Sequence, residues 1–398
     1  IHTPLFKLQR DCTYLVIIKC VVLKLKYFQV VKAISRVAKK NNVYVVSHFY
    51  EKMRCQEKTE LVRSNLVFNR QGAIISAYRK PVDNSASCNA TATEIGSFIT
   101  DFGVTFGVLM PEDLVLQNLE GLKDVRNFVL AGEWQAEIPA LAAPHFYTTW
   151  AYTTNANLVS TAGVFAGKAG LIGHGTDFVV ADLKKDGEVS ISHPIISTNA
   201  APSEDLSQYI IKPLDLTVSR QGVRETVCHG QFCCEFYVKT KSQNLVNYGL
   251  AVFEGIRHYG GQYNIGAQNC ALLPCGGSYK RVTITGNFKL KNSAQFPIIV
   301  STDAQMNNQF KLDKKGVNNT IQVTVKLFGG QKLLNFGVFG RDFARDYEAK
   351  TIVYDNDGLT YKIYEYINSE DVQDFVDYLW IRLRVLIFVV SIYVLEMM

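Results

Sequence analysis

Two cysteine-rich stretches, Cys228-His-Gly-Gln-Phe-Cys233-Cys234-Glu-Phe-Tyr237 and Asn269-Cys270-Ala-Leu-Leu-Pro-Cys275, hold five of the nine cysteines of this 398-residue chain. Dense cysteine usage of this kind is typical of proteins that fold in oxidising compartments, where thiols pair as disulfides. Two Cys-x4-Cys pairs can also bind zinc through four thiolates. The disulfide and zinc interpretations both account for the spacing, and the sequence does not give the connectivity of any disulfides.

Two acceptor sequons for N-linked glycosylation, Asn89-Ala-Thr and Asn318-Asn-Thr, lie in polar stretches that suit exposed loops. Glycosylation at Asn89 or Asn318 requires passage through the secretory pathway. The sequons and the cysteines therefore support each other, and together they favour disulfides over zinc.

The residues around the cysteines resemble the C-terminal domain of the vanin/biotinidase group of amidases, which belong to the nitrilase superfamily. The resemblance rests on Cys233-Cys234 followed by alternating apolar residues, on the strand Tyr248-Gly-Leu-Ala-Val-Phe-Glu-Gly255, and on Cys270-Ala-Leu-Leu-Pro-Cys275. It begins near residue 28 and implies secreted or membrane-anchored proteins. The implied fold class is α/β: a nitrilase-type α-β-β-α sandwich, incomplete at its N-terminus, followed by a β-rich domain cross-linked by disulfides.

The predicted domains follow from this resemblance and from the change in periodicity near Ala201, where helical spacing gives way to short alternating segments. They are an unassigned N-terminal segment (1–27), a nitrilase-like domain (28–200), a β-rich vanin-type domain (201–378) and a hydrophobic tail (379–398).

Composition limits the classes of function. With 47% hydrophobic and 20% charged residues, the chain is too apolar to be disordered and is long enough for two cores. The net charge of +6 is distributed without a basic block, so no nucleic-acid partner is predicted. The seven histidines have no ligand spacing such as His-x-x-x-His, so neither a metal nor a cofactor is predicted.

Local patterns predict elements of the sandwich. Apolar residues between Val30 and Ala38 recur at helical spacing, and the β-branched stretch Val43–Phe49 predicts a buried strand. Residues 65–78 predict two strands joined around Gly72. Phe106–Leu109 predicts a short strand that ends where Pro111 begins a helix.

A nitrilase hydrolyses a carbon–nitrogen bond with a glutamate base, a cysteine nucleophile and a lysine that stabilises the oxyanion. The resemblance places the lysine at Lys80, in Tyr78-Arg-Lys-Pro-Val82, where Pro81-Val82 replace the usual His-Leu. An exposed lysine without a chemical role explains Lys80 equally well. The family's Gly-Ile-x-x-Cys-x-Asp reads Gly107-Val-Leu-Met-Pro111-Glu-Asp113 here, so Pro111 occupies the nucleophile position.

The glutamate base of the family lies upstream of the lysine in a Pro-Glu context, and Asp11-Cys-Thr does not resemble it. Cys88 could serve as another nucleophile, although its place beside a sequon favours a loop or disulfide cysteine. We therefore predict a catalytically inactive protein that binds a small molecule or a protein partner. The alternative is an active amidase on pantetheine- or biotinyl-amide-like substrates, with catalytic residues lost through an error in the gene model.

The C-terminal residues resemble a signal for a glycosylphosphatidylinositol (GPI) anchor. Small residues at Asn368-Ser369 precede a polar spacer, and the apolar run 385–395 follows. That run is shorter than the roughly 20 residues a membrane span requires, and Arg382 and Arg384 favour the alternative of a retained amphipathic end. The predicted location is extracellular, either secreted or GPI-anchored at the cell surface.

Overall fold

The computed structural model describes most of the first 347 residues, which form one compact unit, Ile1–Tyr347. The described residues are 5–8, 13–21, 27–55, 58–82, 95–116, 122, 124–132, 143–173, 179–184, 196–197, 206, 208–214, 219–240, 248–259, 263–273, 279–289, 293–301, 309–328 and 333–347. The predicted hydrophobic tail and the anchor signal lie outside these residues.

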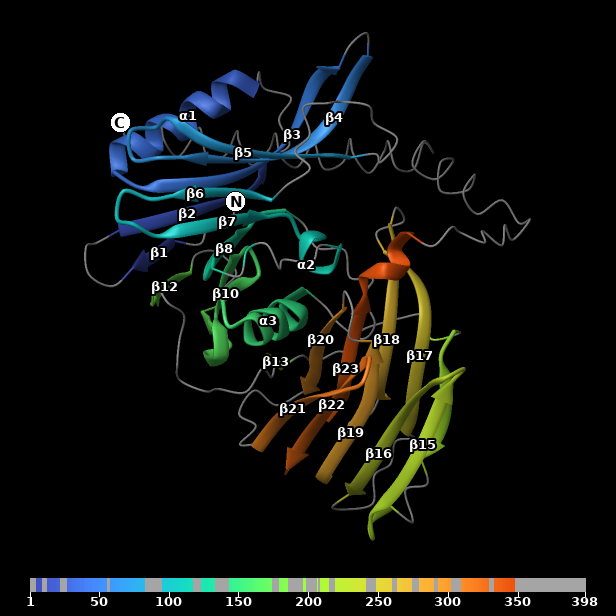
Figure 1. The fold of residues 1–398 in the computed structure, drawn as a ribbon. Coiled ribbons are helices and arrows are strands. Elements are labelled where there is room, and N and C mark those ends of the chain that lie inside the picture. Colours follow the sequence, from blue (N-terminus) through green and yellow to red (C-terminus); the bar gives the residue numbers. More distant parts are fainter. Residues whose placement is uncertain are drawn as a thin grey trace, which may run out of the picture. The chain divides into compact units, whose positions relative to one another are not determined.

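Six strands form the first sheet, called sheet I, in the order β12-β1-β2-β3-β4-β5. Their bounds are Leu5–Leu8 (β1), Thr13–Val21 (β2), Tyr44–Cys55 (β3), Lys58–Phe68 (β4), Ile74–Pro81 (β5) and Val180–Leu183 (β12). Helix α1, Tyr27–Asn41, covers the outer face (Figure 1), where Ile34 and Ala38 pack with Val45 and Phe49. The predicted helix and hairpin are confirmed, and sheet I also takes two strands from residues 1–27.

A second sheet, sheet II, faces sheet I and has the order β11-β10-β9-β8-β7-β6. Its strands are Gly96–Ile99 (β6), Thr105–Leu109 (β7), Asn127–Leu130 (β8), Asn157–Ser160 (β9), Gly163–Ala166 (β10) and Leu171–Gly173 (β11). A short 3-10 turn, Gly167–Ala169, separates β10 from β11. Buried apolar residues such as Val46 and Val108 fill the space between the two sheets.

Helix α3, Ala143–Thr154, packs on the other face of sheet II, where Trp150 contacts Phe128 edge-on with ring centroids 5.2 Å apart. The layers α1, sheet I, sheet II and α3 make the expected α-β-β-α sandwich. Helix α2, Asp113–Leu116, follows β7 and is a single turn.

The remaining strands form two antiparallel-rich sheets. Sheet III has the order β13-β20-β23-β18-β17-β14, with strands Ile196–Ser197 (β13), Ile210–Leu214 (β14), Tyr248–Tyr259 (β17), Tyr263–Leu273 (β18), Ser293–Ser301 (β20) and Leu333–Asp342 (β23). Sheet IV has the order β15-β16-β19-β22-β21, with strands Val223–His229 (β15), Phe232–Thr240 (β16), Tyr279–Lys289 (β19), Gln309–Val317 (β21) and Thr320–Phe328 (β22). A 3-10 turn, Phe343–Tyr347, ends the described chain.

Sheets III and IV enclose a core of their own, and one disulfide crosses it. Cys234 of β16 bonds to Cys270 of β18, with Cα atoms 5.9 Å apart, and both residues are buried. A second disulfide joins Cys228 and Cys233, which stand directly opposite each other in the β15–β16 hairpin. The predicted disulfides are thus confirmed for four cysteines, whose sulfurs are not available as zinc ligands, while Cys275 lies outside the described residues.

Sheet III is joined to the sandwich by apolar and polar contacts. Phe146 of α3 stacks edge-on against Phe296 of β20, with centroids 5.2 Å apart. Arg341 of β23 is fully buried and donates from Nε to the carbonyl of Val115 in α2, at 2.7 Å. The helix that follows β7 is therefore held in part by a side chain of the β-rich half.

Candidate functional site

The site begins with strand alternation. Because successive side chains of a strand point to opposite faces, Tyr78 and Lys80 of β5 both point toward sheet II, as do Arg63 and Asn65 of β4. His48 of β3 faces the same way, opposite Asn65 in the register. These polar residues occupy inward positions of an otherwise apolar layer, next to the turn that joins β7 to α2.

That turn, Met110–Asp113, has the geometry of a helix N-terminus. Backbone donors of Asp113 and Leu114 bond to the carbonyls of Met110 and Pro111, at 3.0 and 3.3 Å. The Asp113 carboxylate accepts a bond from the Met110 amide at 2.7 Å, which satisfies a donor that the helix start leaves without a partner. Pro111 lies at the first helical position, where its missing N–H has no cost.

Lys80 is engaged by the turn. Its ammonium donates to Asp113 Oδ1 in a short hydrogen bond, and the Tyr78 hydroxyl donates to the same oxygen at 3.0 Å. Asp113 is fully buried, and burial raises the pKa of its carboxyl, although the Lys80 charge opposes this rise. Burial and the neighbouring Asp113 also raise the pKa of the Tyr78 phenol. Lys80 is therefore not an exposed lysine, since its side chain is only 13% exposed.

The second carboxylate of the turn, Glu112, is also buried and paired. Its Oε1 lies 2.7 Å from Arg63 Nη2 and 3.8 Å from Lys80 Nζ. The cluster of Arg63, Lys80, Glu112 and Asp113 holds two cations and two anions, so its formal charge is balanced. Balance matters here because an unpaired charge in this interior would cost several kcal/mol.

A hydrogen-bond network centred on Asn65 ties both sheets to the turn. Its Nδ2 donates to the carbonyls of Leu109 and Ala131, at 2.9 and 3.1 Å, where β7 and β8 end. Both amide hydrogens are thereby used, so Asn65 Oδ1 accepts from His48 Nδ1 at 2.7 Å, which fixes the histidine as its Nδ1–H tautomer. Gly132 completes the packing, because a Cβ at this positive-φ position would lie 2.8 Å from the Pro111 ring.

Glu51, a further buried carboxylate of sheet I, points away from the turn. It lies on the α1 side of β3, where it accepts hydrogen bonds from Ser64 at 2.6 Å and Arg79 at 2.7 Å. Since Arg79 alternates with Lys80 along β5, the Glu51–Arg79 pair and the Lys80 cluster lie on opposite faces of the sheet. Glu51 therefore cannot act as a base for a group at position 111.

The structure places Lys80 beside Glu112 and Asp113, the two residues that follow Pro111, in a charge cluster that the sequence pattern did not predict. Sequence reasoning missed His48, Arg63 and Asn65. The signal was weak: each is a polar residue within a strand rich in apolar residues, and neither β3 nor β4 alternates regularly between apolar and polar positions.

Other predicted site residues fall elsewhere. Asn318 is exposed in the turn between β21 and β22, with φ of 53°, a left-handed conformation that asparagine tolerates. Its glycosylation stays a prediction. Cys88 and Asn89 lie outside the described residues. Among the residues that the structure describes, no three His, Cys, Asp or Glu side chains come together as a metal site, and none of the helices has the length and hydrophobicity of a membrane span.

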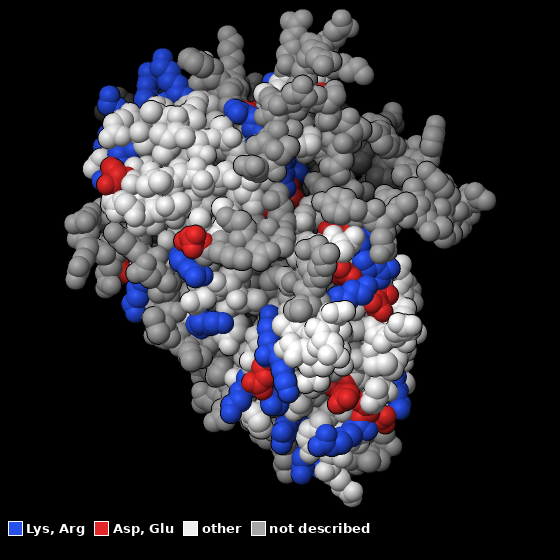
Figure 2. Space-filling model, in the orientation of Figure 1, with Lys and Arg blue, Asp and Glu red and all other residues white. Residues whose placement is uncertain are grey.

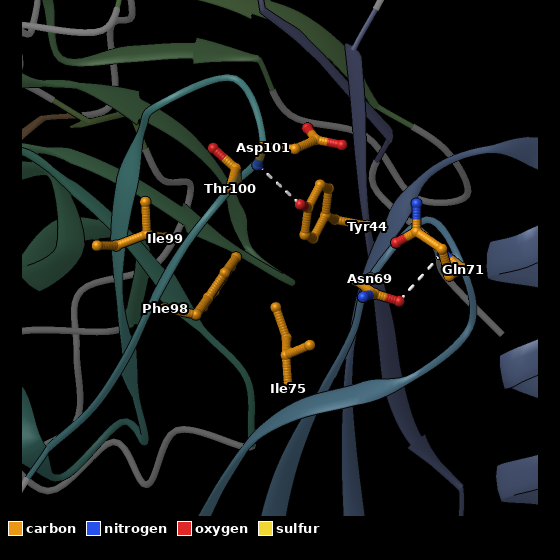
Figure 3. Close-up of a pocket in the computed structure, with 8 residues that line it drawn as sticks. All are labelled: Tyr44, Asn69, Gln71, Ile75, Phe98, Ile99, Thr100 and Asp101. Carbon is orange, nitrogen blue, oxygen red and sulfur yellow. Dashed lines mark hydrogen bonds between the residues drawn. The ribbon is translucent and has the colours of Figure 1, made fainter.

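An open cavity of about 410 Å³ lies at the other end of the same strands. Ile75 at the start of β5 and Phe98 of β6 line it together with Tyr44 and Asp101 (Figure 3), and the Asp101 amide donates to the Tyr44 hydroxyl at 2.9 Å. Lys80 is the second-last residue of β5 and Pro111 follows β7, so this cavity is separate from the charge cluster.

Comparison with known proteins agrees with this architecture. A family model described as the vanin C-terminal domain matches residues 200–346. Vanin-like protein 1 of Drosophila melanogaster is 26% identical over 313 residues, which cover 63% of this chain and 55% of that protein. A pantetheinase of Canis lupus familiaris is 23% identical over 387 residues, covering 81% of this chain and 72% of that enzyme.

Among solved structures, Saccharomyces cerevisiae Nit3, a member of the nitrilase superfamily, covers 37% of this chain and 61% of that chain at 14% identity, with a TM-score of 0.30. The match to the vanin C-terminal domain and these relatives make the chain a vanin/biotinidase-like protein, similar in sequence to vanin-like proteins and to pantetheinases. The chain spans about half of the length of the vanin-like proteins that it matches.

Proposed function

We propose that this vanin-like chain is a catalytically inactive relative of the amidases and that it acts by binding a small molecule or a protein partner. The observation that carries the proposal is Pro111. The family's nucleophile is a thiol at the start of the helix after β7, and proline has no nucleophilic atom. The turn nevertheless keeps its helical geometry, so the architecture is retained without the reactive group.

The charge cluster gives independent support. Lys80, which the resemblance assigns to oxyanion stabilisation, is bonded to Asp113 and lies 3.8 Å from Glu112. A donor that stabilises an oxyanion must be directed at the place where negative charge develops. Here the ammonium already has two carboxylates as partners, and both carboxylates are themselves buried in ion pairs.

We also propose that the protein works outside the cell, either secreted or attached to the surface through a GPI anchor. Two disulfides support an oxidising compartment, and the exposed Asn318 sequon supports passage through the secretory route. Mass spectrometry of protein from culture medium and from the cell surface would test this. If the protein were found in the cytosol and carried neither a glycan nor an anchor, the proposal would be wrong.

The decisive experiment is an amidase assay with pantetheine and a biotinyl amide on the purified protein, alongside the variants Pro111→Cys, Pro111→Ser and Lys80→Met. We expect no turnover by the unmodified protein. Pro111→Cys should react with iodoacetamide at position 111 and still give no multiple turnover, since hydrolysis of an acyl-enzyme also needs a base for water. Pro111→Ser controls for loss of the ring.

The alternative is an active amidase on pantetheine- or biotinyl-amide-like substrates. It is favoured by the pantetheinase relative, which 81% of this chain matches, and by the inward position of Lys80. Turnover by the unmodified protein that is lost in Lys80→Met would establish this alternative and refute the inactive reading. Steady turnover by Pro111→Cys alone would show that a working base is present.

A further inference from the structure

The outward face of sheet IV carries an unusual row of cations. Residues directly opposite each other in neighbouring strands share a face, so the register places Arg224, Tyr237, Thr283, Lys326 and Lys311 in one line across all five strands. The next line along the strands holds Lys239, Arg281, Phe328 and Gln309. We call the five cations of these two lines, Arg224, Lys239, Arg281, Lys311 and Lys326, the basic face.

Two pairs in the basic face have like charges directly opposite each other. Lys239 of β16 stands opposite Arg281 of β19, and Lys326 of β22 stands opposite Lys311 of β21. Like charges in such positions destabilise an antiparallel pair. Charge repulsion within these two pairs does not favour folding, so cross-strand pairing does not explain why the cations stand opposite each other.

The two lines contain no aspartate or glutamate, but the neighbouring line on the same face holds two carboxylates, Glu235 and Asp313. Among the described residues, Lys326 is the member of the basic face with a carboxylate partner, Asp313 Oδ2 at 2.9 Å. The five cations therefore exceed the carboxylates beside them. Arg224, Arg281 and Lys311 are exposed. In the space-filling view, blue side chains are spread over the lower part of the molecule, with red ones among them (Figure 2).

Aromatic rings orient the two arginines. The guanidinium of Arg224 lies 5.1 Å from the Tyr237 ring centroid, and that of Arg281 lies 5.5 Å from the same ring and 5.2 Å from Phe328. A guanidinium that rests on an aromatic ring is pre-oriented, so less conformational entropy is lost when it binds sulfate, phosphate or carboxylate with two hydrogen bonds.

We propose that the basic face binds a linear sulfated polysaccharide. Its cations extend across five strands, about 19 Å at the usual strand spacing, which suits an extended chain with repeated anionic groups. Threonine and glutamine lie between the cations, and these side chains suit the hydroxyls of sugars. An anionic bilayer is a poorer fit, because the strongly exposed large apolar side chains of the described residues are absent from both lines.

The test uses the full chain and heparin as the probe, with affinity measured by surface plasmon resonance at 150 mM NaCl. The test variant replaces three cations of the basic face: Lys239→Gln, Arg281→Gln and Lys311→Gln. The matched control makes the same change in net charge on the exposed side of α1: Lys32→Gln, Lys39→Gln and Lys40→Gln. Circular dichroism confirms that both variants are folded.

We expect the test variant to bind heparin at least tenfold more weakly than the unmodified protein, and the control to bind within twofold. Affinity should fall steeply with salt, because screening weakens exposed charge interactions. If both variants lost heparin affinity equally, the binding would depend on net charge and not on the basic face, and the proposal would be wrong. Binding to phosphatidylserine vesicles without binding to heparin would assign the face to membranes, and equal affinity for a DNA duplex would remove the preference for sulfated polysaccharide.

Discussion

Replacing Arg341 with methionine should weaken the protein more than most single substitutions. Arg341 is 1% exposed and makes three hydrogen bonds: to the Val115 carbonyl at 2.7 Å, to the Gly266 carbonyl in a short bond, and to Asp346 Oδ2 at 2.6 Å. Its guanidinium also lies 4.5 Å from the centroid of the Phe343 ring. Methionine keeps most of the apolar volume and removes every donor.

The cost can be worked from these contacts. Each carbonyl left buried without a donor costs about 1–3 kcal/mol, and removing one partner of a buried ion pair costs about 3–5 kcal/mol. These figures are not additive, and Asp346 is 16% exposed and keeps a hydrogen bond from the Gly266 amide, which reduces the ion-pair cost. We therefore expect a loss of about 4 kcal/mol, against a total stability of roughly 5–15 kcal/mol for a typical domain.

The measurement is urea unfolding followed by far-UV circular dichroism. Arg36→Met on the exposed side of α1 is the control and should change the free energy of unfolding by less than about 0.5 kcal/mol. Arg341→Lys retains the charge and loses the planar fork, so it should fall between the two. A change below about 1 kcal/mol for Arg341→Met would refute the reasoning and would show that apolar contacts alone join sheet III to α2.

Two further predictions concern the disulfides and a lysine of sheet IV. Replacing both cysteines of the Cys234–Cys270 bridge with alanine should cost about 4 kcal/mol, and the same change at Cys228–Cys233 about 2 kcal/mol, because stabilisation grows with the length of the closed loop; equal losses in urea unfolding would contradict this. The Lys314 ammonium donates hydrogen bonds to the backbone carbonyl and to the side-chain Oε1 of Gln295. Burial, together with the nearby charge of Lys168, lowers the pKa of Lys314 to about 8. The unfolded chain therefore binds more protons between pH 8 and 10.5, so stability should rise with pH in this window, and the rise should be smaller in Lys314→Met.

Much of the fold could be predicted because its signals are local. The apolar spacing from Val30 to Ala38 depends only on neighbouring turns of one helix, and α1 confirms it. The turn at Gly72 has φ of 80°, a conformation that glycine adopts without strain, and it joins β4 to β5 as expected. Patterns of this kind need no knowledge of which strands meet.

The pairing of distant residues could not be predicted. Cys234 and Cys270 are 36 residues apart and lie in different sheets, so their bond depends on how sheets III and IV pack. Arg341 and Val115 are 226 residues apart. The sequence near either residue does not indicate this contact. The sequence of β23 predicts a strand, but it does not predict which element packs against that strand.

The candidate site divides in the same way. Lys80 and Pro111 could be placed because each lies in a short motif, but the ion cluster depends on the register of β4 with β5, which sets Arg63 opposite Lys80. That register decides the electrostatics of the site. Without Arg63, Lys80 would be the nearest cation to Glu112 among the described residues, at 3.8 Å. The Glu112 and Asp113 carboxylates would then compete for the Lys80 ammonium.

The turn at Pro111 owes its stability to contacts that involve no thiol. Stability at the start of α2 comes from the Asp113 bond to the Met110 amide and from the proline ring against Gly132, and neither contact uses a thiol. The paired charges of the cluster offset part of the cost of keeping Lys80 in the interior. The proposed loss of catalysis therefore needs no change in the contacts that hold this turn, because they use the Asp113 carboxylate and the proline ring.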